Sequence, residues 1–155
     1  MENLVGFFEC KVDAKGRLSL PSDLKKQLGD QYDKPFILKR SLFQPCLEIH
    51  PMESWEKISE KLSKLNRFVQ KNNEFIRRFT AGVKKTEIDA SNRLQIGKEL
   101  IAFAGIQKDV VLNASIDFIE VWEKEAYEKA VNNNEIDFAA LAEEVMGNSW
   151  DQNVS

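Results

Sequence analysis

Apolar and polar residues alternate along two short stretches near the start of the chain, 7–13 and 17–20, and this alternation predicts two β-strands. Only three residues separate them, and one of these is Gly16. Glycine adopts the positive φ that a three-residue hairpin loop requires. We therefore predict a tight β-hairpin.

A short helix and two more strands follow the hairpin. Residues 21–29 begin with a proline and end with a glycine, which is typical of a helix of about two turns. Strands are predicted at 36–41 and 46–50 around a Phe-Gln-Pro turn. Pro51 then opens a second helix.

Beyond Pro51 the apolar period changes to three and four residues, which predicts helix with a break near Asn72 and Asn73. A stripe of this kind usually packs in a core, although a helix between two modules can also line a groove for a partner or a subunit interface. The stripe comprises Trp55, Ile58, Leu62, Leu65, Phe68, Val69, Phe75, Ile76 and Phe79.

The chain contains an internal repeat. The segment that starts at Asp13 (DAKGRLSLPSDL) aligns without a gap with the segment that starts at Asp89 (DASNRLQIGKEL), at an offset of 76 residues. Further on, the strand at 46–50 is matched by a strand around 119–122. The sequence thus predicts two tandem modules, 1–82 and 83–146, each with a hairpin and helices, followed by a flexible tail at 147–155.

Charge is distributed unevenly. The net charge is −3, yet residues 55–85 carry +6, whereas residues 117–155 carry −8. The overall acidity therefore does not exclude a nucleic-acid partner, because the acidic groups gather in the last quarter of the chain.

The repeated Asp-x-x-x-Arg pattern brackets each predicted hairpin loop. Asp13 should lie opposite Arg17, and Asp89 opposite Arg93, with each carboxylate accepting backbone N–H groups of its own turn. Gly16 supports the first loop, and Asn92 stands at the same place in the second. An exposed pair of this type stabilises a fold by only roughly 0.2 to 1 kcal/mol, so stability alone explains the pattern weakly.

One hypothesis for the function of these loops is that they bind DNA. Arg17 and Arg93 present guanidinium groups that can bond guanine edges or phosphates, and Lys15 at the tip of the first loop can neutralise phosphate charge. The alternative is a pair of solvated turns.

The residues offer little for catalysis or for metal binding. His50 is the single histidine, Cys10 and Cys46 are far apart, and no glycine-rich phosphate loop is present. We expect no enzyme activity, no disulfide, no metal and no cofactor. The N-terminus has no secretory signal and no segment is apolar enough to span a membrane, so we expect a cytoplasmic protein.

The two Asp-x-x-x-Arg segments, the strand that contains Cys46 (PCLEIHP) and the helix that contains Trp55 (WEKI) together resemble the MraZ family over residues 5–145. The resemblance implies an α+β fold in which two tandem AbrB-like swapped-hairpin modules form a pseudo-twofold β-barrel core with flanking helices. It also implies a ring-like homo-oligomer and a nucleoid-associated transcriptional regulator that binds repeated double-stranded DNA sites ahead of the division and cell-wall gene cluster.

Carried onto this chain, the DNA-contacting arginines of the family fall on Arg17 and Arg93, with Lys15 beside the first. The second copy has Ser91 in place of Lys15 and Gly97 in place of Pro21, so its loop is expected to bind DNA more weakly or mainly to hold the fold. Two other functions stay open, a self-assembling scaffold that ignores DNA and an antitoxin-like interaction protein, and the two-copy layout disfavours the second.

Overall fold

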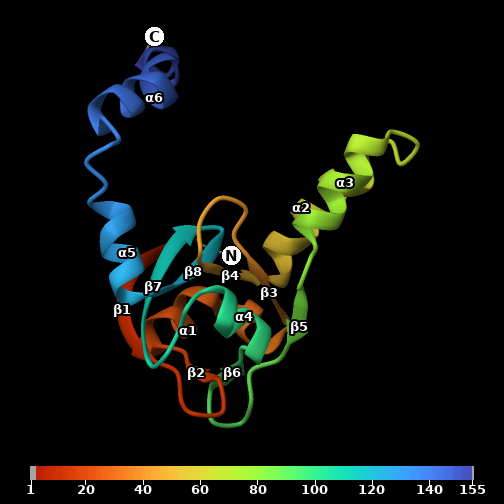
Figure 1. Cartoon of the computed structure of the whole chain (residues 1–155), viewed down its shortest axis with the longest axis vertical. Coiled ribbons are helices and arrows are strands. Elements are labelled where there is room, and N and C mark those ends of the chain that lie inside the picture. The colour runs from red at the N-terminus through yellow and green to blue at the C-terminus, as the bar shows by residue number, and fades with distance from the viewer. Residues whose placement is uncertain (1–2, 155) are drawn as a thin grey trace.

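The computed structural model describes the backbone of residues 3–154 and the side chains of residues 3–147. It is an α+β protein whose strands and short helices form one body, from which two helical segments project (Figure 1). The first copy contains β1 (Leu4–Lys11), β2 (Arg17–Ser19), α1 (Ser22–Leu28), the 3-10 helix η1 (Gly29–Asp33), β3 (Phe36–Arg40) and β4 (Leu47–Pro51).

The second copy repeats this order. It contains β5 (Lys84–Thr86), β6 (Arg93–Gln95), α4 (Lys98–Phe103), β7 (Asp109–Ile116), β8 (Phe118–Glu123), α5 (Lys124–Val131) and α6 (Phe138–Val154). Between the copies lie α2 (Met52–Ser63) and α3 (Gln70–Phe79). The helix predicted at 21–29 and the strands predicted at 36–41 and 46–50 are confirmed as α1, β3 and β4.

The two copies are joined by pairing between their strands. The larger sheet is antiparallel with the order β1-β7-β8-β4-β3-β5, and a second sheet consists of β2 and β6. In this order the first strand of each copy pairs with the other copy, because β1 lies on β7 and β5 lies on β3. The predicted hairpin is therefore short. Its two arms are joined by the Val12–Leu18 bridge and by a backbone hydrogen bond between Asp13 and Arg17, and they then diverge to pair with strands of the other copy.

The pairing register is symmetric under exchange of the copies. Leu18 lies opposite Leu94 at the centre of the β2–β6 pair, and Glu48 lies opposite Glu120 at the centre of the β4–β8 pair. Both are pairs of equivalent residues of the repeat. The barrel implied by the resemblance is not confirmed, since the strands form two separate sheets and not one closed cylinder.

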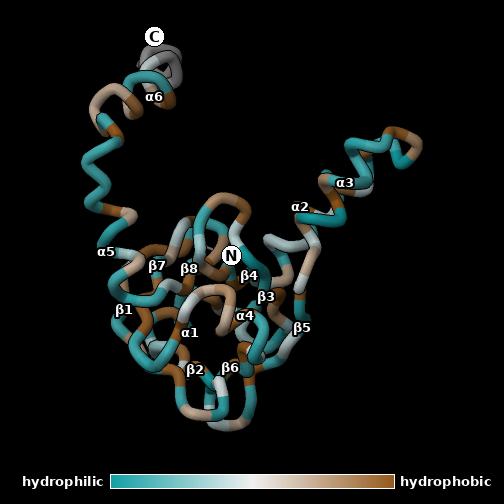
Figure 2. The backbone as a smooth tube through the Cα atoms, viewed as in Figure 1, coloured by the Kyte–Doolittle hydropathy of each residue, from teal (hydrophilic) through white to brown (hydrophobic). Residues whose placement is uncertain are grey.

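The core lies where the sheets meet α1 and α4, and the hydrophobic stretches of the backbone gather in this body (Figure 2). It is built mainly from aliphatic side chains of both copies. Fully buried members include Leu18, Leu24, Leu38, Ile49, Leu94, Ile96, Leu112 and Val121. The two copies therefore share one core, which agrees with the limited ability of a small domain to bury enough surface alone.

Helices α2 and α3 project from the body as a helical hairpin (Figure 1). The predicted break near Asn72 and Asn73 is wrong, because the chain turns at residues 64–69 and both asparagines lie in the first turn of α3. Their side chains hold the turn. The Asn73 amide donates to the Arg67 carbonyl at 2.6 Å, and the Asn72 amide donates to the Asn66 carbonyl at 3.0 Å.

The apolar stripe of this hairpin does not lie in the core, although stripes of this kind usually pack there. Helix α3 buries none of its residues, and Phe68 at the turn is 98% exposed. The stripe packs largely on itself, with the rings of Trp55 and Phe79 stacked at 6.4 Å and those of Phe75 and Phe79 at 5.7 Å. The alternative of a partner-binding surface consequently gains support.

The C-terminal region ends in a helix. Helix α6 continues through Val154 and so covers most of the segment 147–155 for which a flexible tail is predicted, and Ser155 lies outside the described residues. Within the described part of the chain, no helix is long and apolar enough to cross a membrane.

The shared core predicts a large effect of one substitution at the junction of the copies. Leu94 is fully buried opposite Leu18, so Leu94→Ala should lower the free energy of unfolding by about 2 to 5 kcal/mol through lost burial and a cavity. The matched control is Val131→Ala, because Val131 is 62% exposed at the end of α5 and its truncation should change stability by less than about 0.5 kcal/mol. Urea unfolding measures both, and equal small losses would contradict a core that spans the two copies.

Candidate nucleic-acid interface

The Asp13 carboxylate organises the first loop. Its Oδ1 atom accepts the backbone N–H groups of Lys15 at 2.9 Å and Arg17 at 3.0 Å, while its Oδ2 atom accepts the Arg17 Nε–H at 2.7 Å. The backbone closes the turn in addition, since the Asp13 N–H donates to the Arg17 carbonyl at 3.0 Å. Gly16 adopts φ 79°, the positive value that its position requires.

The second loop repeats this geometry. The Asp89 carboxylate accepts N–H groups of Ser91 at 2.8 Å and Arg93 at 3.0 Å through Oδ1, and the Arg93 Nε–H at 3.0 Å through Oδ2. Asn92 takes the place of the glycine at φ 62°, a left-handed conformation that asparagine tolerates better than most residues. The Asp–Arg pairing predicted in both copies is thus present, and so are the predicted carboxylate bonds to the turn.

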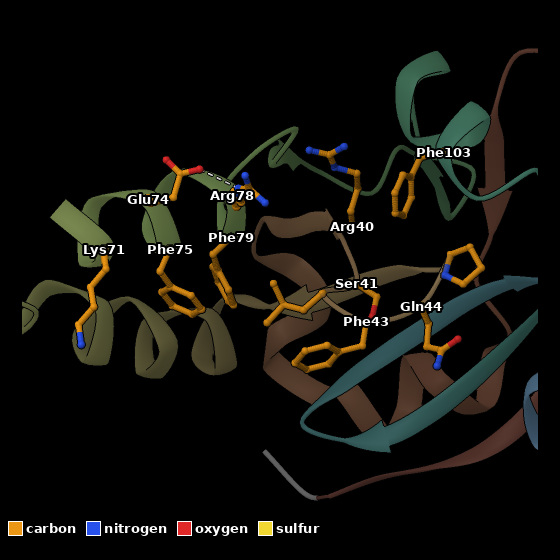
Figure 3. Close-up of a pocket in the computed structure, with 12 residues that line it drawn as sticks. Arg40, Ser41, Phe43, Gln44, Lys71, Glu74, Phe75, Arg78, Phe79 and Phe103 are labelled. Atoms are coloured by element: carbon orange, nitrogen blue, oxygen red, sulfur yellow. Dashed lines mark hydrogen bonds and ion pairs between the residues drawn. The ribbon is translucent and has the colours of Figure 1, made fainter. Parts of the chain in front are cut away.

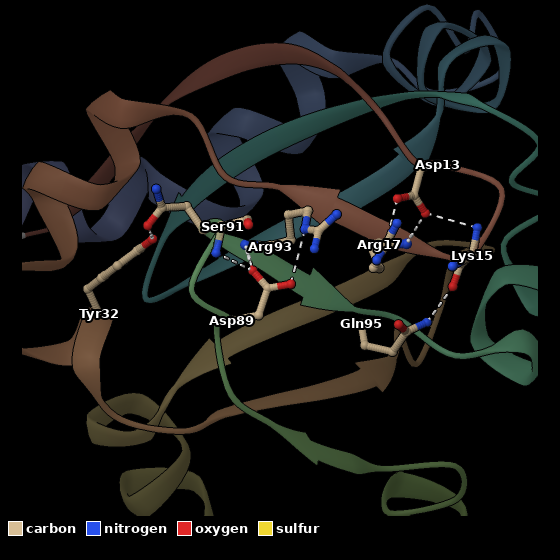
Figure 4. A network of polar contacts seen from close by, with 9 residues as sticks. Asp13, Lys15, Arg17, Tyr32, Asp89, Ser91, Arg93 and Gln95 are labelled. Carbon is tan, nitrogen blue, oxygen red and sulfur yellow. Dashed lines mark hydrogen bonds and ion pairs between the residues drawn. The ribbon is translucent and has the colours of Figure 1, made fainter.

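The β2–β6 pairing brings the two loops together (Figure 4). Arg17 lies opposite Gln95 and Arg93 lies opposite Ser19, whereas Leu18 and Leu94 between them are buried. Because side chains alternate along a strand, the two arginines and their partners share the outer face of this two-stranded ribbon. Diagonal neighbours of this kind have Cα atoms about 7–8 Å apart.

Two further residues support these loops and were not predicted from the sequence. The Gln95 amide donates to the Lys15 carbonyl at 2.6 Å, which ties the second strand to the first loop. The Tyr32 hydroxyl donates to the Asn92 side chain, which ties η1 of the first copy to the second loop (Figure 4). Both contacts cross between the copies, so the spacing of residues within one copy gave no signal of them.

The electrostatics of both loops favour the ionised form of the aspartate. The backbone N–H of Arg17 is the main cause of a lowered pKa of the Asp13 carboxyl, and the Arg17 guanidinium and the Lys15 N–H act in the same direction. For Asp89, partial desolvation raises the pKa, but the N–H groups of Arg93 and Ser91 and the Arg93 guanidinium outweigh it and the net shift is downward.

Among the described residues, each guanidinium donates a hydrogen bond through its Nε atom alone. The Nε of Arg17 bonds to Asp13 and the Nε of Arg93 to Asp89, and the two arginine side chains remain 29% and 30% exposed. The Nη atoms at the far edge of each group are the donors that a planar acceptor would meet. Lys15 is exposed at the tip of the first loop, and Ser91 occupies the corresponding place in the second.

Comparison with known proteins agrees with the repeat. The family model described as "MraZ protein", with the qualifier antitoxin-like, matches residues 4–78 and again residues 79–148. The chain belongs to the MraZ family.

MraZ relatives match over nearly the whole chain. A protein of Flavobacterium psychrophilum is 57% identical over 148 residues, which cover 96% of this chain and 94% of the relative. One from Christiangramia forsetii is 55% identical over 148 residues, with 96% of both chains covered. A protein from Phocaeicola vulgatus is 36% identical over 144 residues, with 92% of this chain and 93% of the relative covered. All three are named transcriptional regulator MraZ.

The remaining candidate residues lie away from this interface or take no part in it. Cys10 and Cys46 are free thiols, and burial raises the pKa of Cys46 to about 12 with the negative charge of Glu120 adding to the effect. Within the described residues, no three His, Cys, Asp or Glu side chains come together as a metal site would require.

The loop geometry predicts a pH dependence. The lowered pKa of Asp13 means that its bonds to the turn are complete above the pKa of an unfolded aspartate and are lost as the pH falls through the lower folded value. An NMR titration should therefore show the Lys15 and Arg17 amide signals moving with a midpoint below the usual range of an aspartate. Arg17→Ala should raise that midpoint, because it removes the guanidinium. A midpoint within or above the usual range in the unmodified protein would contradict the proposed hydrogen bonding.

Proposed function

We propose that this MraZ protein is a sequence-specific DNA-binding transcriptional regulator, located in the cytoplasm and associated with the nucleoid, that binds repeated sites ahead of the division and cell-wall gene cluster. The names of its relatives support the regulatory role. The outer face of the β2–β6 ribbon, with Arg17 and Arg93 on one surface, supports DNA as the partner. It is the observation that carries the proposal.

The two-stranded form of the ribbon favours the major groove as its site of binding. The major groove of B-DNA is about 12 Å wide and admits a two-stranded β-ribbon, and an arginine fork bonds the O6 and N7 atoms of guanine there. With Nε of each arginine already bonded to Asp13 or Asp89, the Nη edge is oriented in advance, which lowers the entropy cost of binding.

Self-assembly fits the same proposal. One ribbon supplies few phosphate contacts, so useful affinity requires several ribbons acting on several sites at once. A ring-like homo-oligomer, which the resemblance implies, would supply them. The swapped-hairpin, AbrB-like character of the modules is part of this proposal and is supported by the pairing of β1 with β7 and of β5 with β3.

A second candidate is an antitoxin-like interaction protein without promoter-specific DNA binding, because the family description carries that qualifier. Footprinting of the purified protein on the DNA upstream of its own gene separates the two. Regulation predicts protected sites at regular spacing. A protein that protects no part of that DNA, at low salt and high concentration, would contradict the proposed function.

The sharpest test of the interface concerns Arg17. If Arg17 contacts DNA, Arg17→Ala should leave folding nearly unchanged and remove roughly 1 to 3 kcal/mol of binding free energy. Arg17→Lys keeps the charge but loses the fork, so a bidentate base contact would be largely lost, whereas a simple phosphate contact would mostly survive. Fluorescence anisotropy with a repeat-containing duplex measures both, with circular dichroism as the control for folding.

The two copies should contribute unequally. The first loop carries Lys15 where the second carries Ser91, so Arg17→Ala should weaken binding more than Arg93→Ala. Negligible losses in both variants would show that the ribbon is not the DNA-binding surface.

Binding should be cooperative and sensitive to salt. Each phosphate contact releases a counterion, so affinity should fall steeply between low and moderate salt. A duplex with several repeats should bind far more tightly than a duplex with one repeat. Equal affinities for the two duplexes would contradict binding through several ribbons.

A further inference from the structure

An open groove lies at the base of the α2–α3 hairpin, away from the loops. It has a volume of about 770 Å³ and lies between α3, the β3–β4 loop and α4. Phe75 and Phe79 project from one side of α3, with Phe43 beside them (Figure 3). Phe43 is 88% exposed and Phe75 is 45% exposed, so a strongly apolar surface is open to solvent.

The rim of this groove is basic. Arg40, Lys71 and Arg78 line it, against Glu74 as the acidic residue of the lining. Glu74 is already neutralised, because it pairs with Arg78 at 2.7 Å and with Arg77 at 2.6 Å. The groove therefore offers an apolar floor with an excess of positive charge, which suits an acidic amphipathic helix.

Helix α6 has this chemistry. In its described part, residues 138–147, the larger apolar side chains recur at helical spacing and are exposed: Phe138, Leu141, Val145 and Met146. Residues 132–147 carry four acidic groups and no basic group. The helix stands away from the body (Figure 1), although helices in proteins gain most of their stability by packing an apolar face against another surface. A covering surface would therefore bury these exposed apolar side chains.

We propose that α6 of one copy docks in the α3 groove of a second copy, with its apolar stripe on Phe75 and Phe43 and its glutamates against Lys71 and Arg78. This inference rests on the proposed self-association and names the surfaces that make it. Helix α6 and helix α3 project at opposite sides of the body (Figure 1). A contact between two different surfaces joins copies head to tail, and such a contact closes into a ring or extends into a filament.

The proposed contact leaves the DNA-binding face uncovered. The β2–β6 ribbon lies at the end of the body opposite to α3 and α6 (Figure 1). Each added copy would therefore contribute one more exposed ribbon, which is what binding to repeated sites requires.

Charge reversal on each surface tests the contact in the full chain. Lys71→Glu/Arg78→Glu in the groove and Glu143→Lys/Glu144→Lys in α6 should each weaken self-association by roughly tenfold or more, measured by sedimentation velocity. A mixture of the two variants should associate again, since their charges are complementary. Matched controls with equal changes of charge are Lys57→Glu/Lys64→Glu on α2 and Glu125→Lys/Glu128→Lys on α5, which should associate like the unmodified protein.

The outcomes separate this inference from the proposed function. If the unmodified protein assembles and the groove and α6 variants assemble equally well, the docking inference is wrong while self-association stands. If the unmodified protein is a monomer, docking and self-association both fail, and footprinting still decides DNA binding independently. Whenever the unmodified protein assembles, the Arg17→Ala variant should assemble to the same extent.

Cross-linking distinguishes docking between copies from docking within one chain. Phe75→Cys and Val145→Cys, made in separate chains and mixed under mild oxidation, should form a disulfide-linked dimer, whereas either variant alone should not form it. The unmodified protein is the control for Cys10 and for Cys46, which is fully buried. A double variant that cross-links only within a single chain would overturn the proposal.

Discussion

The antiparallel pairing of β2 with β6 is the interaction on which the rest of the structure depends. It places Leu18 against Leu94 in the shared core and, on the opposite face, Arg17 and Arg93 on one surface. Without this pairing each loop would be a separate solvated turn. With it, two short segments that lie 76 residues apart in sequence form a single ribbon.

The same symmetry explains why neither copy is self-sufficient. Each copy supplies a first strand to the other copy, so β1 and β5 complete their sheet only after both copies are present. The β4–β8 pair, centred on Glu48 and Glu120, then joins the two halves of the large sheet. A duplication of this kind makes one cooperative unit, because the buried leucines and isoleucines come from both copies.

Much of the local structure followed from the sequence. The loop residues Asp13, Arg17, Asp89 and Arg93 pair as predicted, and Gly16 and Asn92 adopt positive φ, because a three-residue turn leaves few alternatives. The pairing of the strands, in contrast, could not be predicted from the sequence. Alternation shows which face of a strand is buried and says nothing of which strand lies beside it. The supporting roles of Gln95 and Tyr32 were missed for this reason.

For the helical regions, the predictions from the sequence were wrong for a different reason. Periodicity correctly identified α2 and α3 as amphipathic. It does not show whether their apolar stripe packs in the core or lies exposed at a binding surface, because the sequence pattern is the same in both cases. Phe68 and Phe75 are exposed here, and so is the stripe of α6. The turn at residues 64–69 was misplaced because Asn72 and Asn73 were read as helix breakers, whereas their side chains brace the turn from inside α3.

Hydrogen exchange, followed by mass spectrometry with and without a repeat-containing duplex, tests the central claim most directly. If one ribbon formed by both copies reads DNA, peptides covering residues 13–19 and 89–95 should gain protection together when DNA is added, while the peptide covering α3 should not. Protection of α3 with both loops unchanged would contradict the account.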